Sequence, residues 1–435
     1  MTNPTRNQGL LEWYLDMLSR PWIQVIAGLL LMLNTWGLIN AFGVFQDYYS
    51  SFDPPLASAS AISWIGSLQL FCLLAFGSAT GILVDKGFAR TMVFFGCGCI
   101  TISSVLASFS GEFTGHDTRP VYYQVLLSQG LLAGIGMSLL LVPSTSIIPT
   151  YVSKHRAVAV GVANTGASIG GVIYPILVRK LLGDLGFHWA MRVIALVVFL
   201  MTSMGFLLLR QRRELIEKRP RRILYDVKCM SEIHYALFAV GVAFGFAGLF
   251  IPYFYLTTWV RDTAFPLRGG LQPYHFLSIL NAGGLLGRVA PSMLADRVPS
   301  GPALVQGLAA LGCALLAGIW LLIETSFAGL LCWTLAYGFC SGSVISLIPA
   351  TAAMLTKDMG KLGGRIGLVF AMNAFASLLG SPVAGAVLKN TPSGWTGLAL
   401  YSAALNLASG SLLMACWTAT VWKQRSGPIE SVIEG

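Results

Sequence analysis

Charged residues are scarce in this chain, and their scarcity excludes most soluble folds. Only 11% of its 435 residues are Asp, Glu, Lys or Arg, whereas 55% are hydrophobic. Soluble domains carry roughly 25% charged residues, so a soluble fold of this composition would lack a wettable surface. We therefore expect the chain to lie in a lipid bilayer, which is its first predicted partner.

Several kinds of chemistry are missing as well. Seven of the eight cysteines lie in apolar stretches, and their spacing matches no disulfide framework or metal site. The five histidines fall in loops or at predicted helix ends, where they form no catalytic pair at membrane depth. There is no glycosylation sequon and no apparent cleavable signal sequence. We predict that the protein is not an enzyme and that it has no catalytic residue, metal or cofactor.

What the sequence does contain is a set of long charge-free runs. Twelve runs of 17 or more residues lack Asp, Glu, Lys and Arg. Each can supply the roughly 20 apolar residues of a membrane-crossing helix, with Phe187–Met191 lengthening the shortest run. The predicted fold class is an all-α membrane protein with twelve transmembrane helices in two six-helix halves. The runs are Pro21–Gln46, Pro54–Val84, Thr91–Gly111, Pro120–Ser153, Ala157–Val178, Val193–Leu209, Ile233–Val260, Gly269–Gly287, Val298–Ile323, Thr325–Thr356, Ile366–Leu388 and Asn390–Trp422.

The basic residues mark one side of the predicted membrane. With the N-terminus placed inside, 20 of the 28 Lys and Arg fall on inner segments and 7 on outer segments or helix ends. This bias follows the positive-inside rule and predicts a multi-pass protein with both termini in the cytoplasm. It also accounts for the net charge of +10 without a nucleic-acid partner.

One basic segment divides the chain. Residues 210–232 carry eight Lys or Arg and follow the sixth run. We interpret them as a cytoplasmic linker that either lies along the anionic inner leaflet or forms a disordered tether. The predicted organisation is a cytoplasmic N-terminal segment (1–20), a six-helix half (21–209), the linker (210–232), a second six-helix half (233–422) and a cytoplasmic tail (423–435).

Two sequence echoes relate the predicted halves. The second predicted span ends in Leu-x-Asp85-Lys86, and the eighth ends in Leu-x-Asp296-Arg297. A hydroxyl residue followed by lysine, at Ser153-Lys154 and at Thr356-Lys357, likewise precedes the fifth and eleventh spans. Internal repeats of this kind are typical of transporter folds.

The loop after the second run resembles the signature loop of the major facilitator superfamily. It carries Gly81, Asp85, Lys86, Gly87 and Arg90, and together with the twelve-span layout the resemblance covers nearly the whole chain. Three further features resemble the monocarboxylate-porter branch, especially its fungal members. They are Ala41–Phe45 after span one, Tyr151–Gly161 entering span five, and Gly287-Arg288 ahead of Leu294–Arg297 in span eight.

This resemblance implies a secondary transporter that works by alternating access in the plasma membrane. The predicted cargo is a small organic acid or acid-like metabolite. Protons are a predicted partner only because the resemblance to the superfamily implies transport driven by a proton gradient. Efflux of a fungal secondary metabolite and uptake of a monocarboxylate or another nutrient both remain open. The alternative function from a different class of protein is a non-transporting membrane sensor, although segments 1–20 and 423–435 are short for a signalling tail.

Arg288 is the one clear charge inside a predicted span. Holding an arginine near mid-bilayer costs roughly 2.5–3.5 kcal/mol, so its side chain should face a cavity or a partner. A guanidinium suits a carboxylate bound by two hydrogen bonds, while the alternative is an arginine that snorkels or only packs helices. The other predicted substrate-binding residues are Asn281, Asn34, Tyr253 and Asn373, although buried amides and tyrosines can also serve as interhelical hydrogen bonds.

One departure from the porter branch bears on the cargo. In the animal carboxylate porters an acidic residue one turn before this arginine is associated with proton coupling, but Gly284 stands there in this sequence. The lysine of the family near span one is also missing from Pro21–Gln46. We therefore expect a larger, partly apolar organic acid or a neutral metabolite in place of lactate with a proton.

Two further groups of residues have predicted roles. By resemblance, the charged loops latch the inner side of the transporter, although an ordinary topology-setting loop would look the same. Small residues in span five favour close helix packing or a hinge. Trp259, near the outer end of span seven, is expected in the membrane interface. The gating set is Asp85, Lys86, Arg90, Asp296 and Arg297, and the packing set is Gly161, Gly166, Gly170, Gly171 and Pro175.

Overall fold

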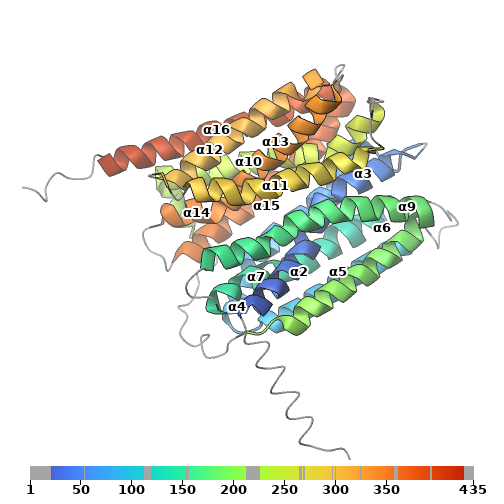
Figure 1. Ribbon diagram of the computed structural model, residues 1–435, viewed down its shortest axis with the longest axis horizontal. Coiled ribbons are helices and arrows are strands. Elements are labelled where there is room, and N and C mark those ends of the chain that lie inside the picture. Colours follow the sequence, from blue (N-terminus) through green and yellow to red (C-terminus); the bar gives the residue numbers. More distant parts are fainter. Residues whose placement is uncertain are drawn as a thin grey trace, which may run out of the picture.

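In the computed structural model, every regular secondary-structure element among the described residues is a helix (Figure 1). These residues are 21–52, 54–111, 119–151, 156–211, 226–263, 267, 270–295, 297–298, 300–323, 326–356, 361–391 and 394–425. The α-helices are α2 Pro21–Asn40, α3 Phe42–Ser50, α4 Ala59–Asp85, α5 Ala89–Ser108, α6 Tyr122–Val125, α7 Ala133–Ser146, α8 Ile148–Tyr151, α9 Arg156–Leu208, α10 Ile233–Asp262, α11 Pro273–Ala295, α12 Gly301–Ile319, α13 Phe327–Ser346, α14 Ile348–Met354, α15 Leu362–Asn390 and α16 Trp395–Arg425. The π-helix η2 (Leu126–Leu132) joins α6 to α7, and the short 3-10 helices are η4 (Val227–Ser231) and η5 (Trp320–Ile323).

The helices confirm the predicted twelve-span class. Within the described residues, ten helical stretches are long and apolar enough to cross a membrane. One of them, α9, holds two spans, because Gly186 has the non-helical angles φ 73° and ψ 174° and separates span five from span six. The eighth span is α11, whose 23 residues include the polar Asn281 and Arg288. Phe187 directly follows the break in α9, as expected from its place ahead of the sixth run.

The first span is longer than the sequence predicts. A single residue, Ala41, separates α2 from α3, and α3 continues to Ser50. Asp47 is therefore part of the span, with 3% of its surface exposed. The prediction that Arg288 is the one charge inside a span is therefore wrong. Asp47 directly follows the apolar run, and its carboxylate forms an ion pair with Arg261.

The helices form two bundles (Figure 1). The blue-to-green helices, α2 to α9, gather on one side, and the yellow-to-red helices, α10 to α16, gather on the other. Helices α4 and α15, α9 and α11, and α3 and α10 pack against each other across the boundary. At one end of the molecule α9 finishes and α10 begins, on either side of residues 212–225. We call this end the linker end. The opposite end, where α3 finishes and α4 begins, is called the far end.

An internal sequence repeat relates the two bundles, and helices α9 and α15 show it more clearly than the loops do. In α9 an arginine is followed by Asn164, Ser168 and Gly171 at intervals of eight, four and three residues. Helix α15 repeats these residue types at the same intervals, with Arg365, Asn373, Ser377 and Gly380. Each helix packs across the boundary, α9 on α11 and α15 on α4, so the repeat lies at equivalent seams.

Glycines bring α2 and α9 into close contact. A Cβ added at Gly166 would overlap the carbonyl oxygen of Leu29, and one at Gly170 would lie 2.5 Å from that of Leu33. Gly37 of α2 faces Gly170 directly. Helices can approach this closely in a membrane only where side chains are small. Gly161 differs, since open space surrounds the position of its missing Cβ.

The predicted hinge at Pro175 does not interrupt the helix. Helix α9 continues through this proline, and its non-helical residue is Gly186. Trp259 also differs from the expectation. Its side chain is fully buried, and its ring centre lies 5.6 Å from that of Trp320, so the prediction of an interfacial position is wrong.

Gly166→Ala should destabilise the protein, whereas Gly161→Ala should not. Overpacking a tight contact costs roughly 1–3 kcal/mol. An alanine in open helix is more favourable than glycine by about 1 kcal/mol. Thermal unfolding of both variants in detergent measures the difference. Equal melting temperatures for the two variants would contradict the close contact between α2 and α9.

The end of the predicted linker is docked against α15. Arg365 Nε lies 3.2 Å from Asp226 Oδ2, and its Nη2 pairs with Glu232. The main-chain nitrogen of Asp226 donates to the carbonyl of Gly364 at 3.3 Å. The hydrogen bond from Arg365 lowers the pKa of Glu232 below its ordinary value of 4.5. Residues 226–232 are thus held to the second bundle by charge.

The docked segment should make stability depend on acidity. Because the folded-state pKa of Glu232 is lowered, its contribution is complete above about pH 4.5 and is lost as pH falls below that value. The wild-type protein should therefore lose more thermal stability than Glu232→Gln between pH 5 and pH 3.5. Melting curves of the two proteins across this range measure the effect, and parallel curves would contradict it.

Candidate transport site

Two polar residues on one side of α11, Ser278 and Asn281, contact α9 across the boundary between the bundles. Ser278 Oγ donates to the carbonyl of Val172 at 2.9 Å. Asn281 lies against Gly171, where an added Cβ would overlap its amide, while its Nδ2 donates to Leu277 O at 2.9 Å. These contacts come from both bundles, so this seam belongs to neither alone.

Arg288 lies two turns further along the same helix. Its Nη1 donates to Ser168 Oγ at 2.7 Å and to the carbonyl of Asn164 at 3.4 Å. In the part of the chain that the structure describes, no carboxylate lies within ion-pair distance of this guanidinium. Its charge therefore meets a hydroxyl and a carbonyl, and most of its five N–H donors remain available to an anion.

Gly284, one turn before Arg288, is surrounded by polar groups, and a Cβ there would lie 3.5 Å from the carbonyl oxygen of Gly338. The same Cβ would lie 3.8 Å from Tyr253 Oη and 3.9 Å from Ser168 Oγ, which is ordinary contact. Tyr253 Oη is 3.0 Å from Ser341 Oγ, and either hydroxyl can donate. Polar groups from α9, α10, α11 and α13 thus converge around Gly284. The structure brings together the predicted Arg288, Asn281 and Tyr253.

A cluster of buried aromatic rings adjoins this polar cluster. The ring of Tyr253 lies 5.6 Å from that of Phe250, which in turn stacks on Trp36 of α2 at 6.4 Å. Phe254 meets Phe42 edge to face at 4.9 Å. The rings come from both bundles, so the boundary beside Arg288 is aromatic. Such a boundary suits a cargo with one anionic group and an apolar body.

The two remaining predicted substrate residues lie elsewhere. Asn34 is satisfied within the first bundle, because Tyr174 Oη donates to its Oδ1 at 2.6 Å and its Nδ2 donates to Leu30 O at 2.7 Å. Asn373 is fully buried in α15, and neither polar atom of its side chain has a hydrogen-bond partner among the described residues. It occupies the repeat position of Asn164, whose carbonyl contacts Arg288.

In the loop predicted to act as a gate, the carbonyl oxygen of Val84 accepts two hydrogen bonds. Gly87, with φ +94°, ends α4, and its nitrogen donates to Val84 O at 3.0 Å. Gln211 Nε2 donates to the same carbonyl at 2.6 Å. The guanidinium carbon of Arg90 lies 5.1 Å from the ring centre of Phe206 within the first bundle. Lys86 is exposed.

Less is described of the other gating residues. The side chain of Asp85 and the whole of Asp296 lie outside the described residues, while Arg297 is exposed. Among the described residues, no group of three or more His, Cys, Asp or Glu side chains is placed to hold a metal ion.

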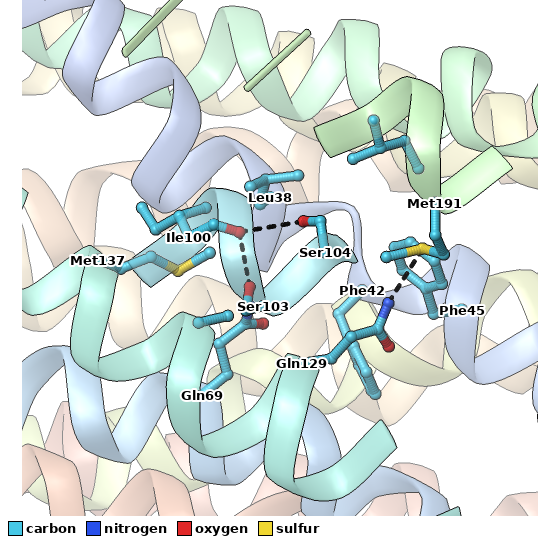
Figure 2. Close-up of a pocket in the computed structure, with 12 residues that line it drawn as sticks. Leu38, Phe42, Phe45, Gln69, Ile100, Ser103, Ser104, Gln129, Met137 and Met191 are labelled. Atoms are coloured by element: carbon cyan, nitrogen blue, oxygen red, sulfur yellow. Dashed lines mark hydrogen bonds between the residues drawn. The ribbon is translucent and has the colours of Figure 1, made fainter. Parts of the chain in front are cut away.

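A small cavity lies inside the first bundle (Figure 2). Its volume of about 30 Å³ has room for one or two water molecules, too little for a metabolite. Gln69 and Gln129 line it, and Gln129 Oε1 accepts a hydrogen bond from Tyr49 Oη at 2.6 Å. Gln129 lies in the π-helix η2, a distortion that the sequence does not reveal.

The chain was compared with models of known protein families. Residues 25–361 match the model of the Major Facilitator Superfamily. The chain belongs to this superfamily. It is therefore a membrane transporter, and the resemblance of its signature loop is confirmed at the level of the superfamily. The finer resemblance to monocarboxylate porters stays a hypothesis.

Several fungal transporters are similar in sequence to this facilitator. It is 38% identical over 394 residues to the MFS-type transporter dbaD of Emericella nidulans, with 90% of this chain and 85% of the relative covered. It is 32% identical to the agnestins efflux protein AgnL12 of Paecilomyces divaricatus, covering 92% and 88% of the two chains. It is 33% identical to the aspyridones efflux protein apdF of Emericella nidulans, covering 91% and 77%.

Solved structures share the fold of this facilitator at low sequence identity. A crystal structure of a nucleoside transporter, NupG, aligns with a TM-score of 0.72 at 14% identity, covering 91% of this chain and 99% of the other. The peptide transporter POT in complex with alafosfalin aligns with a TM-score of 0.70 at 16% identity, covering 91% and 93%. These likenesses establish the helical arrangement alone.

Ser168→Ala should slow transport more than the repeat-equivalent Ser377→Ala. Ser168 orients Arg288, whereas the hydroxyl of Ser377 donates to Ala374 O within its own helix. A hydrogen bond to a charged group is worth roughly 1.5–3 kcal/mol, which corresponds to a tenfold or greater loss. Initial efflux rates at matched expression measure this difference. Equal rates in the two variants would remove Ser168 from the site.

Proposed function

We propose that this facilitator exports an anionic organic metabolite from the cytoplasm by alternating access, with Arg288 binding the anionic group. The observation that carries the proposal is the guanidinium at the boundary of the two bundles. It is held by Ser168 of the opposite bundle and lies one turn after Gly284, where a carboxylate or other large side chain is absent. A charge retained at this depth without an acidic partner among the described residues is expected to serve the cargo.

The aromatic boundary supports a cargo larger than lactate. Rings from both bundles continue from Tyr253 through Phe250 to Trp36. An organic acid with an apolar or aromatic body would place its anionic group at Arg288 and its body against these rings. Two relatives are named as efflux proteins for agnestins and aspyridones, and this favours export over uptake of a nutrient.

We further propose that the linker end faces the cytoplasm at the plasma membrane, with both termini inside. The excess of Lys and Arg on the segments at that end supports this orientation. Residues 21–209 and 233–422 would then rock against each other around the site. The gating role of the Asp85 and Asp296 loops, and proton-driven exchange, are part of the same proposal by analogy with the superfamily.

Metabolite profiling of cells and medium tests the proposal. Three strains are compared: wild type, gene deletion, and a strain that carries Arg288→Gln. We expect an acidic compound to accumulate inside the deletion and Arg288→Gln cells and to appear in the medium of the wild type. As the charge control, Lys180→Gln removes an exposed cation from α9 and should export normally.

Two results would contradict export through this site. A compound that disappears from the medium only when the wild-type protein is present would indicate uptake. Normal export by Arg288→Gln at normal membrane expression would exclude the guanidinium from cargo binding.

A further inference from the structure

A buried ion pair joins the two bundles at the far end, away from Arg288. Arg261 of α10 places Nη1 2.7 Å from Asp47 Oδ1, and only 4% of the Asp47 side chain is exposed. The same guanidinium donates to the main-chain carbonyl of Asp47 at 2.7 Å and to Ser50 Oγ at 3.3 Å. One arginine of the second bundle therefore holds the last turn of α3 in the first bundle at three points.

We propose that Asp47 and Arg261 form the outer gate of the transport path. The proposal rests on alternating access and on the membrane orientation given under the proposed function. Release of cargo to the outside requires α3 and α10 to separate at the far end, and this movement must break the pair. While the pair is intact, the outer side is closed.

The surroundings of the pair form a closed seam. One turn before Asp47, a Cβ at Gly43 would overlap the carbonyl oxygen of Tyr253, so α3 and α10 touch through their main chains. Ser60, at the start of α4, donates to Pro382 O of α15 at 2.7 Å. Tyr255 Oη donates to Ala59 O at 3.2 Å. The ion pair thus ends a seam that already joins the bundles from α3 to α4.

Each member of the pair has a second partner in its own bundle, so the gate can open without isolating a charge. Asp47 Oδ2 lies 3.7 Å from Arg179 Nη1 of α9. Arg261 Nη2 lies 2.9 Å from Asp262 Oδ1. When the bundles part, Asp47 keeps Arg179 and Arg261 keeps Asp262. Opening then costs one ion pair and avoids the larger penalty of an unpaired charge in an apolar setting.

The test measures opening at the far end without any cargo. Thr257, one turn before Arg261 and 1% exposed, is replaced by Cys as a reporter. Its rate of reaction with a membrane-impermeant maleimide is measured in right-side-out and inside-out vesicles. Vesicles that contain the protein without Thr257→Cys supply the background from the native thiols.

Four proteins that carry the reporter are compared with the reporter alone. Asp47→Asn and Arg261→Gln should each raise the labelling rate from the outside by about fivefold or more. The double variant should label no faster than the faster single variant, because both changes break the same bond. Asp184→Asn removes an exposed carboxylate of α9 near the far end and should leave the rate unchanged.

Several outcomes would overturn the gate. Unchanged labelling in both single variants would do so, as would a double variant whose increase equals the product of the two single increases. An increase seen only in inside-out vesicles would overturn the orientation and the outer gate with it. Size-exclusion profiles exclude unfolding as the cause of labelling. Since no cargo is used, failure here leaves the export measurements with Arg288→Gln untouched.

Discussion

The cost of placing charge among apolar helices determines where the charged groups of this protein lie. Asp47 is shared between Arg261 and Arg179, and Arg365 is shared between Asp226 and Glu232. Each of these groups joins parts of the chain that lie far apart in sequence. Arg288 has a hydroxyl and a carbonyl in place of an acid. The paired charges join distant parts of the chain, whereas Arg288 has no acidic partner among the described residues, which is why we propose that it binds the cargo.

The repeat between the bundles shows how the difference between Arg288 and the paired charges arises. Asp85 and Asp296 occupy equivalent loops, and the position eight residues before each is Gly77 in α4 and Arg288 in α11. The partner helices α15 and α9 carry Ser377 and Ser168 at matching positions. At this pair of equivalent positions one seam carries a glycine and the other a cation. Under the proposed function, that cation would bind the anionic group of the cargo and so fix its orientation.

The sequence predicts the helices and much of the site, because runs without charge and a lone buried arginine are local signals. Asn281 and Tyr253 could be placed near Arg288 by helical spacing and span order. The ion pair of Asp47 could not be predicted from the sequence. A charge at the end of an apolar run is read as the boundary of a span until its partner is known. Asn34 and Trp259 depend on Tyr174 and Trp320, which are distant in sequence. The π-helix around Gln129 leaves no recognisable pattern either.

The glycine contacts between α2 and α9 limit how the molecule can move. Gly37 and Gly170 meet backbone to backbone, with no side chains between them that could change rotamer and let the helices slide. Spans one and five would therefore move together during alternating access, and relative movement would fall at the boundaries where α9 meets α11 and α4 meets α15. Because Arg288 contacts α9 through Ser168, and α2 leads into α3 through Ala41, a shift of α9 would also displace α3.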